Sequence, residues 1–340
     1  MAEFIRNTWY PLAWSRDVGR KLARRTVIGD DIVMYRTEAG HVVALEDACP
    51  HRLAPLSDGR LQGDEIECGY HGLRFDASGA CTRAPGQARM PTAIRARAYP
   101  VQENMGVAWV WMGEPHLAES TPVFDLPPYH QAGYSFVEGD ALYIECNYLS
   151  LADNLCDPCH VAYVHTTTLA NAHHEDVLPQ YEVQGDKVVT WRWVIDSPLI
   201  PVFEGLKDFG GNVDRWHFYH YYPPGIAVID FGSSKTGTGA PEGQRGDCIE
   251  MFACHFITPI DERSCIDHWL CVKNSPADPE VDKRLLAGLR TAFAEDKAIL
   301  EAIQRNEEKP RAWKPVKLAI DASSVRMRQM VTDRLRAESA

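Results

Sequence analysis

Apolar and polar residues alternate in two different ways along this chain, and the change falls near residue 115. Before it, the apolar runs are short, contain many β-branched and aromatic residues, and are separated by turns rich in glycine and acidic residues. Such runs are typical of β-strands. We predict strands at residues 26–28, 32–36, 41–45 and 107–111, and therefore a small all-β domain at residues 1–115.

A Pro-rich connector containing Pro115, Pro122, Pro127 and Pro128 follows this domain. Longer alternating segments come next and predict the strands of one antiparallel sheet. They lie at residues 188–195, 216–222, 226–231, 249–257 and 266–272. With helices packed on this sheet, residues 116–340 are expected to form an α+β domain.

One late helix has clear signals at both ends. Asp278 can cap its N-terminus, Pro279 suits the first helical position, and Lys309-Pro310 ends its range. An apolar stripe at helical spacing is formed by Val281, Leu285, Leu289 and Phe293. A second C-terminal helix is expected at about residues 321–336.

Composition narrows the classes of protein. Thirty-five basic and 47 acidic residues give a formal net charge of −12, which argues against a nucleic-acid partner and against an anionic membrane surface. The N-terminus lacks the pattern of a signal peptide, and no apolar run is long enough to span a membrane. Ten cysteines without a disulfide-framework spacing favour a reduced, cytoplasmic protein.

Two Cys/His pairs indicate a metal centre in the first domain. Cys49 and His51 form a C-x-H pair, and Cys68 and His71 form a C-x-x-H pair. A structural zinc site takes mixed thiolate and imidazole ligands, whereas a Rieske [2Fe-2S] cluster takes two thiolates on one iron and two imidazoles on the other. Because Cys precedes His in both pairs, two matching loops favour the Rieske cluster, and zinc is the alternative.

A second cluster of candidate ligands lies at residues 153–165. His160 and His165 are close enough in sequence to reach one ion, but a third ligand has to come from elsewhere. Two imidazoles and one carboxylate form the facial triad of non-haem iron oxygenases. The alternative is that both are ordinary hydrogen-bonded histidines. The C-x-x-C sequence of Cys156 and Cys159 is better interpreted as two buried structural thiols than as a redox pair.

Together these motifs resemble the Rieske non-haem iron oxygenases. The resemblance rests on Cys49-Pro50-His51-Arg52, on Cys68-Gly69-Tyr70-His71-Gly72, and on the Asn154, Asp157, His160, His165 pattern. It implies a Rieske [2Fe-2S] domain at residues 1–115 and a catalytic mononuclear non-haem iron domain at residues 116–340. Within the family the chain is most similar to vanillate O-demethylase, toluenesulfonate methyl-monooxygenase and dicamba O-demethylase.

The resemblance also implies roles for single residues. The cluster ligands would be Cys49, His51, Cys68 and His71, and the ligands of one Fe(II) would be His160, His165 and a carboxylate on the late helix. We predict Asp296 for that carboxylate, because the stripe through Leu289 and Phe293 places position 296 on the buried face and turns Glu295 away.

Asp157 resembles the acid that links two metal centres of neighbouring subunits in this family. It would accept hydrogen bonds from His71 of one chain and His160 of the next, and so provide a route for an electron. This arrangement implies a homo-oligomer, usually a trimer. Asn154 is expected beside the iron.

For function, the resemblance implies the oxygenase component of a multicomponent monooxygenase. No G-x-G-x-x-G follows a predicted strand, so NADH is expected to act through a separate reductase, with or without a ferredoxin. The expected reaction is O2-dependent O-demethylation of a vanillate-like aromatic acid to the phenol and formaldehyde. Aryl methyl hydroxylation and ring cis-dihydroxylation are alternatives. His255 and Asp230, on apolar strands, are candidates for the substrate pocket.

Overall fold

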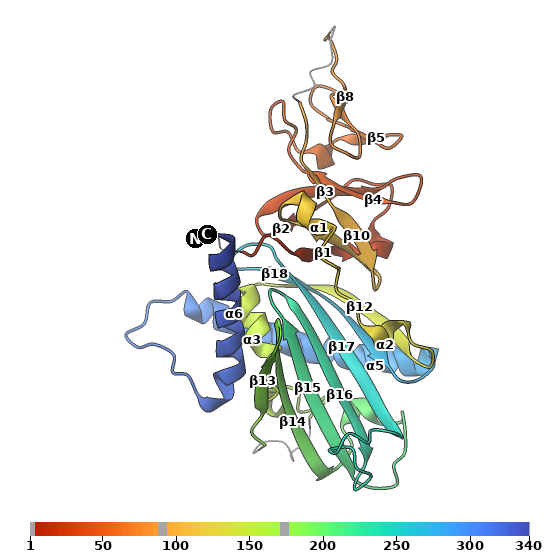
Figure 1. Cartoon of the computed structure of the whole chain (residues 1–340), viewed down its shortest axis with the longest axis vertical. Helices are drawn as coiled ribbons and strands as arrows, with labels where there is room; N and C mark the ends of the chain where they lie inside the picture. Colours follow the sequence, from red (N-terminus) through yellow and green to blue (C-terminus); the bar gives the residue numbers. More distant parts are fainter. Residues whose placement is uncertain (1–3, 88–93, 171–176, 340) are drawn as a thin grey trace. The chain divides into compact units, whose positions relative to one another are not determined.

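The computed structural model describes residues 4–87, 94–170 and 177–339, and the chain divides into two compact units. The N-terminal unit contains Ala2–Asp125 and the short segment Thr258–Asp261. The C-terminal unit contains Leu126–Ile257 and Glu262–Ala340. Figure 1 shows strands throughout the first unit and one large sheet with helices in the second. None of the helices in these ranges is long and apolar enough to cross a membrane.

Three small sheets build the N-terminal unit. Their strand orders are β1-β11-β10, β2-β3-β4-β9 and β5-β6-β7-β8. The strands are β1 Trp9–Trp14, β2 Ala23–Val27, β3 Asp30–Arg36, β4 Val42–Glu46, β5 Arg60–Gln62, β6 Glu65–Glu67, β7 Arg74–Phe75, β8 Cys81–Arg83, β9 Ala98–Tyr99, β10 Val101–Asn104 and β11 Val107–Trp111. The helical turns are η1 Ser15–Asp17, η2 Leu56–Asp58 and α1 Pro115–Ala118.

Strand β3 explains why the sequence of this unit contains continuous apolar runs instead of alternating apolar and polar residues. Ile32 and Met34 pack into one apolar cluster with residues of β1 and β11. Val33 and Tyr35 pack into another cluster, together with residues of β6 and β7. A strand that is buried on both faces has no solvent-facing positions to be filled by polar residues. The predicted all-β class of this part of the chain is confirmed.

A seven-stranded antiparallel sheet forms the C-terminal unit, with the order β12-β18-β17-β16-β15-β14-β13. Its strands are β12 Ser135–Ile144, β13 Gln180–Gln184, β14 Lys187–Ser197, β15 Val213–Tyr222, β16 Ile226–Lys235, β17 Cys248–Pro259 and β18 Cys265–Lys273. The helices and helical turns are α2 Pro127–His130, α3 Tyr148–Asn154, α4 Val161–Val164, η3 Pro201–Phe203, α5 Pro279–Glu307, η4 Ala319–Asp321 and α6 Ala322–Glu338. This confirms the predicted α+β class.

Helix α5 packs along one face of the sheet and carries Asp296 to it. Leu285, Leu289 and Phe293 belong to the main apolar cluster of this unit, which also contains Met251 of β17 and Trp269 of β18. Asp296 is buried on the same side of the helix. The predicted apolar stripe therefore places a single carboxylate on the face of α5 that is removed from solvent.

The N-cap of α5 provides a test of this account. The Asp278 carboxylate accepts hydrogen bonds from the backbone N–H groups of Glu280 and Val281, at 2.9 and 3.1 Å. Replacing Asp278 by alanine removes both bonds and should lower the free energy of unfolding by about 1 kcal/mol, whereas Asp278→Asn keeps the cap. Urea midpoints followed by tryptophan fluorescence measure the difference. Equal midpoints for the two variants would contradict it.

Candidate metal centres

The two loops that carry the Cys/His pairs have the same backbone conformation. In each loop the cysteine N–H donates to the carbonyl five residues later, and the cysteine carbonyl accepts from the N–H four residues later. The bonds are Cys49 N to Ala54 O and Leu53 N to Cys49 O, both 2.8 Å, and Cys68 N to Leu73 O and Gly72 N to Cys68 O, at 2.8 and 3.1 Å. The structure thus has the two matching loops expected from the order of the ligands.

Both loops need one residue in the left-handed region at the same position. Leu53 has a φ of 58° and Gly72 a φ of 70°. Glycine adopts this conformation freely, whereas leucine does so at a cost of about 1–2 kcal/mol. The hydrogen bonds that close the first loop hold Leu53 there.

Side chains of the two loops meet in a way that fits a Rieske cluster. The Cys49 and Cys68 thiols are buried and interact with each other, and the His51 and His71 rings lie 4.6 Å apart at their centroids and are exposed. Burial raises the pKa of the Cys49 thiol to about 11, so this thiol is protonated at neutral pH unless a metal binds it. Loss of hydration, followed by the neighbouring His51 and Arg52, lowers the pKa of His71 and favours the neutral, ligating imidazole.

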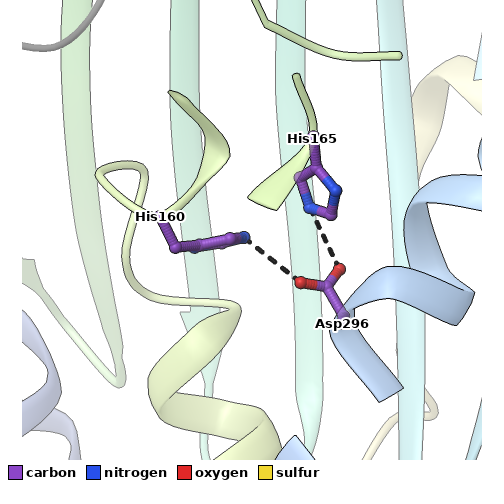
Figure 2. A group of neighbouring side chains, drawn as sticks. All are labelled: His160, His165 and Asp296. Atoms are coloured by element: carbon purple, nitrogen blue, oxygen red, sulfur yellow. Dashed lines mark ion pairs between the residues drawn. The ribbon is translucent and has the colours of Figure 1, made fainter. Parts of the chain in front are cut away.

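His160, His165 and Asp296 converge in the C-terminal unit (Figure 2). One Asp296 carboxylate oxygen lies 3.5 Å from His160 Nε2, and the other lies 3.2 Å from His165 Nε2. One potential ligand atom from each residue lies within 4.8 Å of the other two. His160 is the N-cap residue of α4 and His165 its C-cap residue, so this single helical turn presents both imidazoles to α5. The three groups fit the facial triad of a mononuclear iron.

Neighbouring side chains orient this triad. Asn154 Nδ2 donates to Asp296 Oδ1 at 2.9 Å, which places the asparagine beside the site. Glu295 Oε2 lies 2.9 Å from His165 Nδ1 and fixes the direction of that ring. The role of Glu295 was missed in the sequence, where it figured only as the less favoured ligand. The sequence signal for this role is the pair of adjacent acids, Glu295 and Asp296, which contact the two ring nitrogens of His165.

Electrostatics favour the metal-binding protonation states of Asp296 and His160. Burial acts to raise the pKa of Asp296, but the hydrogen bond with His165 and the charges of both histidines outweigh it and lower this pKa. Burial lowers the pKa of His160, which keeps its ring neutral. Burial also acts to lower the pKa of His165, but Asp296 and Glu295 raise it.

A cavity adjoins the triad. Apart from His160, His165 and Asp296, its polar wall residues are Asn154, His217 and Tyr219. Its apolar wall is formed by Leu155, Val161, Leu169, Ile200, Ile229, Phe231, Ala253, Leu289 and Phe293. The free space inside is about 40 Å³, little more than a water molecule occupies. An aromatic molecule therefore enters only if wall side chains move.

The sequence assigned no role to His217 and Tyr219. They occupy alternate positions of β15 and so face the same side of the sheet as the triad. His173 and His174, two further histidines that could serve as ligands, lie outside the described residues.

Asp230 and His255, the two residues predicted for the substrate pocket, are not among the described residues that line this cavity. Asp230 points to the opposite face of the sheet, because its neighbours Ile229 and Phe231 face the cavity. There it accepts hydrogen bonds from Trp216 Nε1 and Arg245 Nη1, at 2.6 and 2.7 Å.

His255 lies on the cavity side of the sheet, but it is behind the wall residue Phe293 and does not line the cavity. Its ring packs edge-on against Phe293, with centroids 4.7 Å apart, and Phe293 is part of the cavity wall. Its partner is Asp267, whose Oδ2 atom lies 2.7 Å from His255 Nδ1. Both His255 and Asp267 are buried.

Asp157 is near His160 but does not line the cavity beside the triad. Its carboxylate accepts a hydrogen bond from Cys159 N at 2.6 Å, which forms a tight turn before α4. Asp157 and His160 both line a second depression of the C-terminal unit, separate from the cavity just described. His160 Nδ1 is buried and forms no hydrogen bond of normal geometry with the described residues.

Comparison with known proteins agrees with both centres. Residues 8–100 match the Rieske [2Fe-2S] domain family, and residues 144–337 match the vanillate O-demethylase oxygenase C-terminal domain family. A putative toluene-4-sulfonate monooxygenase system iron-sulfur subunit of Comamonas testosteroni is 34% identical over 98% of both chains. The vanillate O-demethylase oxygenase subunit of a Pseudomonas strain is 32% identical over 98% of this chain and 96% of the relative.

Solved structures show the same fold. Dicamba monooxygenase bound to dicamba superimposes with a TM-score of 0.89 and 29% identity, over 99% of each chain. An all-β iron-sulfur domain joined to a sheet-and-helix iron domain is the architecture of an oxygenase with two metal centres.

The chain belongs to the Rieske non-haem iron oxygenases, in the family that contains vanillate O-demethylase oxygenase. It is an enzyme whose cofactors are a Rieske [2Fe-2S] cluster and a mononuclear non-haem iron, and in this family NADH acts through a reductase. Names such as "oxygenase subunit" among the relatives imply that the reductase is a separate protein.

The buried His255–Asp267 pair generates a prediction. Replacing Asp267 by alanine leaves the His255 ring without its acceptor and should lower the free energy of unfolding by about 1–3 kcal/mol. Asp267→Asn keeps an acceptor oxygen and should lose less. Urea unfolding of the metal-loaded protein measures both variants. The account is wrong if the asparagine variant is as unstable as the alanine variant.

Proposed function

We propose that this enzyme O-demethylates a methoxylated aromatic acid, using O2 and electrons from a separate reductase. The observation that carries the proposal is the His160, His165 and Asp296 triad beside an apolar cavity, in a domain of the vanillate O-demethylase type. The overall reaction consumes the methyl ether, O2, two electrons and two protons, and yields the phenol, formaldehyde and water.

For the metal ligands we propose the residues expected from the sequence. Cys49, His51, Cys68 and His71 would hold the cluster in domain 1–115, and His160, His165 and Asp296 would hold the iron in domain 116–340. When bound, the iron supplies activation of O2 and the cluster supplies electrons one at a time. The meeting of each ligand set within its own unit supports the assignment.

The remaining residues prepare the site for this chemistry. Asn154 and Glu295 hold the carboxylate and one imidazole in the direction a metal requires. The apolar wall, with Phe231 and Phe293, suits an aromatic ring and excludes water when the ring is in place. Oxidation at the methoxy carbon gives a hemiacetal, which collapses to the phenol and formaldehyde.

Hydroxylation of an aryl methyl group is the second candidate. The similarity to toluene-4-sulfonate monooxygenase subunits, at 34% identity over nearly the whole chain, favours it. The same triad and cavity serve both reactions, since each oxidises a methyl group that the ring carries either through an ether oxygen or directly. The products separate the candidates, because only O-demethylation releases formaldehyde.

We also propose a homotrimer in which Asp157 joins two subunits. In it, Asp157 would accept from His71 of one chain and from His160 of the next. Three features support this arrangement: the exposed rings of His51 and His71, the depression shared by Asp157 and His160, and the buried His160 Nδ1 atom. Cytoplasmic location stays a prediction, supported by ten unpaired cysteines.

Metal and product analysis test the function together. Protein purified without oxygen should contain about three irons and about two sulfides per chain and show a Rieske visible spectrum. Supplied with O2 and a plant-type ferredoxin kept reduced by its NADPH reductase, it should release formaldehyde from 4-hydroxy-3-methoxybenzoate or 3-methoxybenzoate in step with phenol. A benzylic alcohol from 4-toluenesulfonate, without formaldehyde, would favour the second candidate. Zinc without sulfide, or a cis-diol product, would overturn both.

Replacement of the two adjacent acids separates their roles. Asp296→Ala should remove about one iron per chain and abolish turnover, while the visible spectrum of the cluster stays unchanged. Glu295→Gln should keep the cluster and bind iron about 10-fold to 100-fold more weakly, because it loses the charged acceptor that orients His165. Iron titration of the metal-free proteins measures both. Full iron content and activity in Asp296→Ala would show that the ligand is wrongly assigned.

A further inference from the structure

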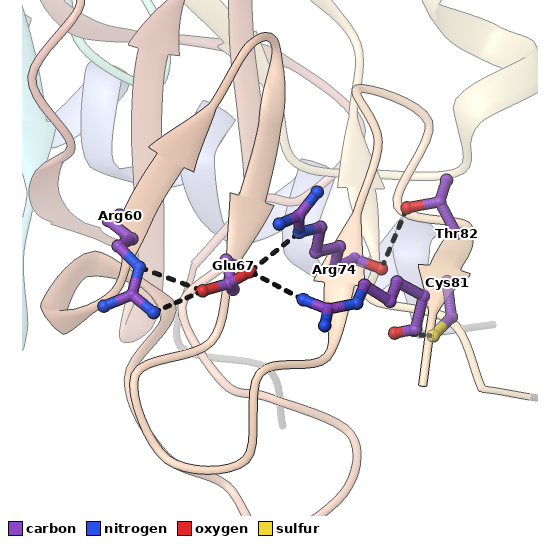
Figure 3. A network of polar contacts seen from close by, with 6 residues as sticks. Arg60, Glu67, Arg74, Cys81 and Thr82 are labelled. Carbon is purple, nitrogen blue, oxygen red and sulfur yellow. Dashed lines mark hydrogen bonds and ion pairs between the residues drawn. The ribbon is translucent and has the colours of Figure 1, made fainter. Parts of the chain in front are cut away.

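A row of charged side chains crosses the outer face of the small sheet that carries the second Cys/His pair (Figure 3). Glu67 of β6 is the cross-strand partner of Arg60 on β5 and of Arg74 on β7, and Arg74 is in turn the partner of Arg83 on β8. We call these four residues the arginine row. Ile66 and Phe75, on the opposite face, are fully buried, so strand alternation directs the row outward.

All three arginines bind the same carboxylate. Arg60 Nε donates to Glu67 Oε1 at 2.9 Å, and Arg74 Nε and Arg83 Nη1 donate to Oε2 at 2.7 and 3.2 Å. The hydrogen bonds from Arg74 and Arg60 lower the pKa of the Glu67 carboxyl, which stays ionised at neutral pH. Glu67 therefore holds the three guanidinium groups side by side.

The row leaves positive charge facing solvent. Three guanidinium groups and one carboxylate give a local balance of +2, and no other acidic side chain in the described part of the chain forms an ion pair with these arginines. The Arg60 and Arg83 side chains are 69% and 52% exposed, whereas Glu67 is 5% exposed. A partner that approaches this face meets the guanidinium groups before it meets the carboxylate.

This local charge contrasts with the rest of the protein. The chain as a whole carries −12, which repels an acidic protein at long range. A positive patch on such a molecule attracts an acidic partner at one place and so orients the encounter.

The row also lies next to the cluster loop in the sequence. Strand β6 ends at Glu67, directly before Cys68, and β7 begins at Arg74, three residues after His71. A partner held by the row is therefore seated on the sheet whose β6–β7 hairpin presents Cys68 and His71. An electron donor needs such closeness, whereas a substrate does not.

We propose that the arginine row is the docking surface for the acidic face of the iron-sulfur protein that delivers electrons to the cluster. This inference rests on the function proposed above, because it requires a Rieske cluster that an external protein reduces. In the step itself one electron leaves the donor's iron-sulfur centre and reduces the cluster, and no bond is made or broken at the docking surface.

Stopped-flow reduction of the cluster tests the docking surface. The donor is a plant-type [2Fe-2S] ferredoxin, which is acidic and has a reduction potential below that of Rieske centres. At low salt, the double variant Arg60→Gln/Arg83→Gln should be reduced about threefold to tenfold more slowly than the unaltered protein. The difference should vanish at about 0.5 M NaCl, where charges are screened within a few ångströms. Arg60→Lys/Arg83→Lys keeps the charge and should restore most of the rate.

Two controls isolate the electrostatic effect. Arg25→Gln removes an exposed arginine of β2, in a different sheet of the same unit, and should leave the rate unchanged. Reduced methyl viologen is a cation, so its reaction with the cluster should be no slower in the double variant. Equal ferredoxin rates for the double variant and the unaltered protein, or an equal loss in Arg25→Gln, would overturn the proposal.

Two further outcomes also overturn it. If the double variant changes the oligomeric state in light scattering and leaves the ferredoxin rate intact, the row is a contact between copies of this chain. If methyl viologen slows as much as ferredoxin, the row acts on the cluster and not on docking. Formaldehyde release with O2 and with the ferredoxin kept reduced by its NADPH reductase is measured in parallel, and its absence in an unaltered protein whose cluster the ferredoxin reduces marks a failure of the proposed function instead.

Discussion

The contact of one carboxylate with two imidazoles is the constraint on which the C-terminal unit depends. Asp296 approaches His160 and His165 although it lies on a helix far from them in the sequence. Holding an ionised group in a buried position requires partners for both of its oxygens, and here the histidines and Asn154 supply them. The length of α5, its capped start and its apolar stripe all serve to bring that carboxylate to this point and keep it there.

The N-terminal unit uses one local conformation twice for a comparable purpose. Each loop turns its cysteine into the apolar cluster beneath and its histidine out toward solvent. The division would suit the proposed cluster, because a bound metal would stabilise the buried thiolates, whereas a cluster that exchanges electrons with another protein needs an edge near the surface. The residue with the left-handed backbone conformation is Gly72 in one loop and Leu53 in the other.

Charge is distributed unevenly over the N-terminal unit. The acidic balance of the whole chain would by itself repel an acidic redox partner, yet one buried glutamate gathers three arginines on the sheet that carries the second Cys/His pair. The carboxylate reduces the repulsion among the guanidinium groups and still leaves them in excess. A net charge therefore says little about any one face of a protein, since a few cross-strand pairs can invert it locally.

The sequence by itself determined the structural features that depend on residues close together in the chain. Apolar runs and period-two patterns predicted half of the described strands, and a period-3.6 stripe predicted the helix α5 with its cap at Asp278. The order of Cys49, His51, Cys68 and His71 predicted two matching loops. Only the tertiary structure decided which face of each strand turns to the iron site. Asp230 faces away, His255 pairs with Asp267 behind Phe293, and His217 and Tyr219 line the cavity. Alternation tells which residues share a face, but strand register and helix packing decide what that face meets.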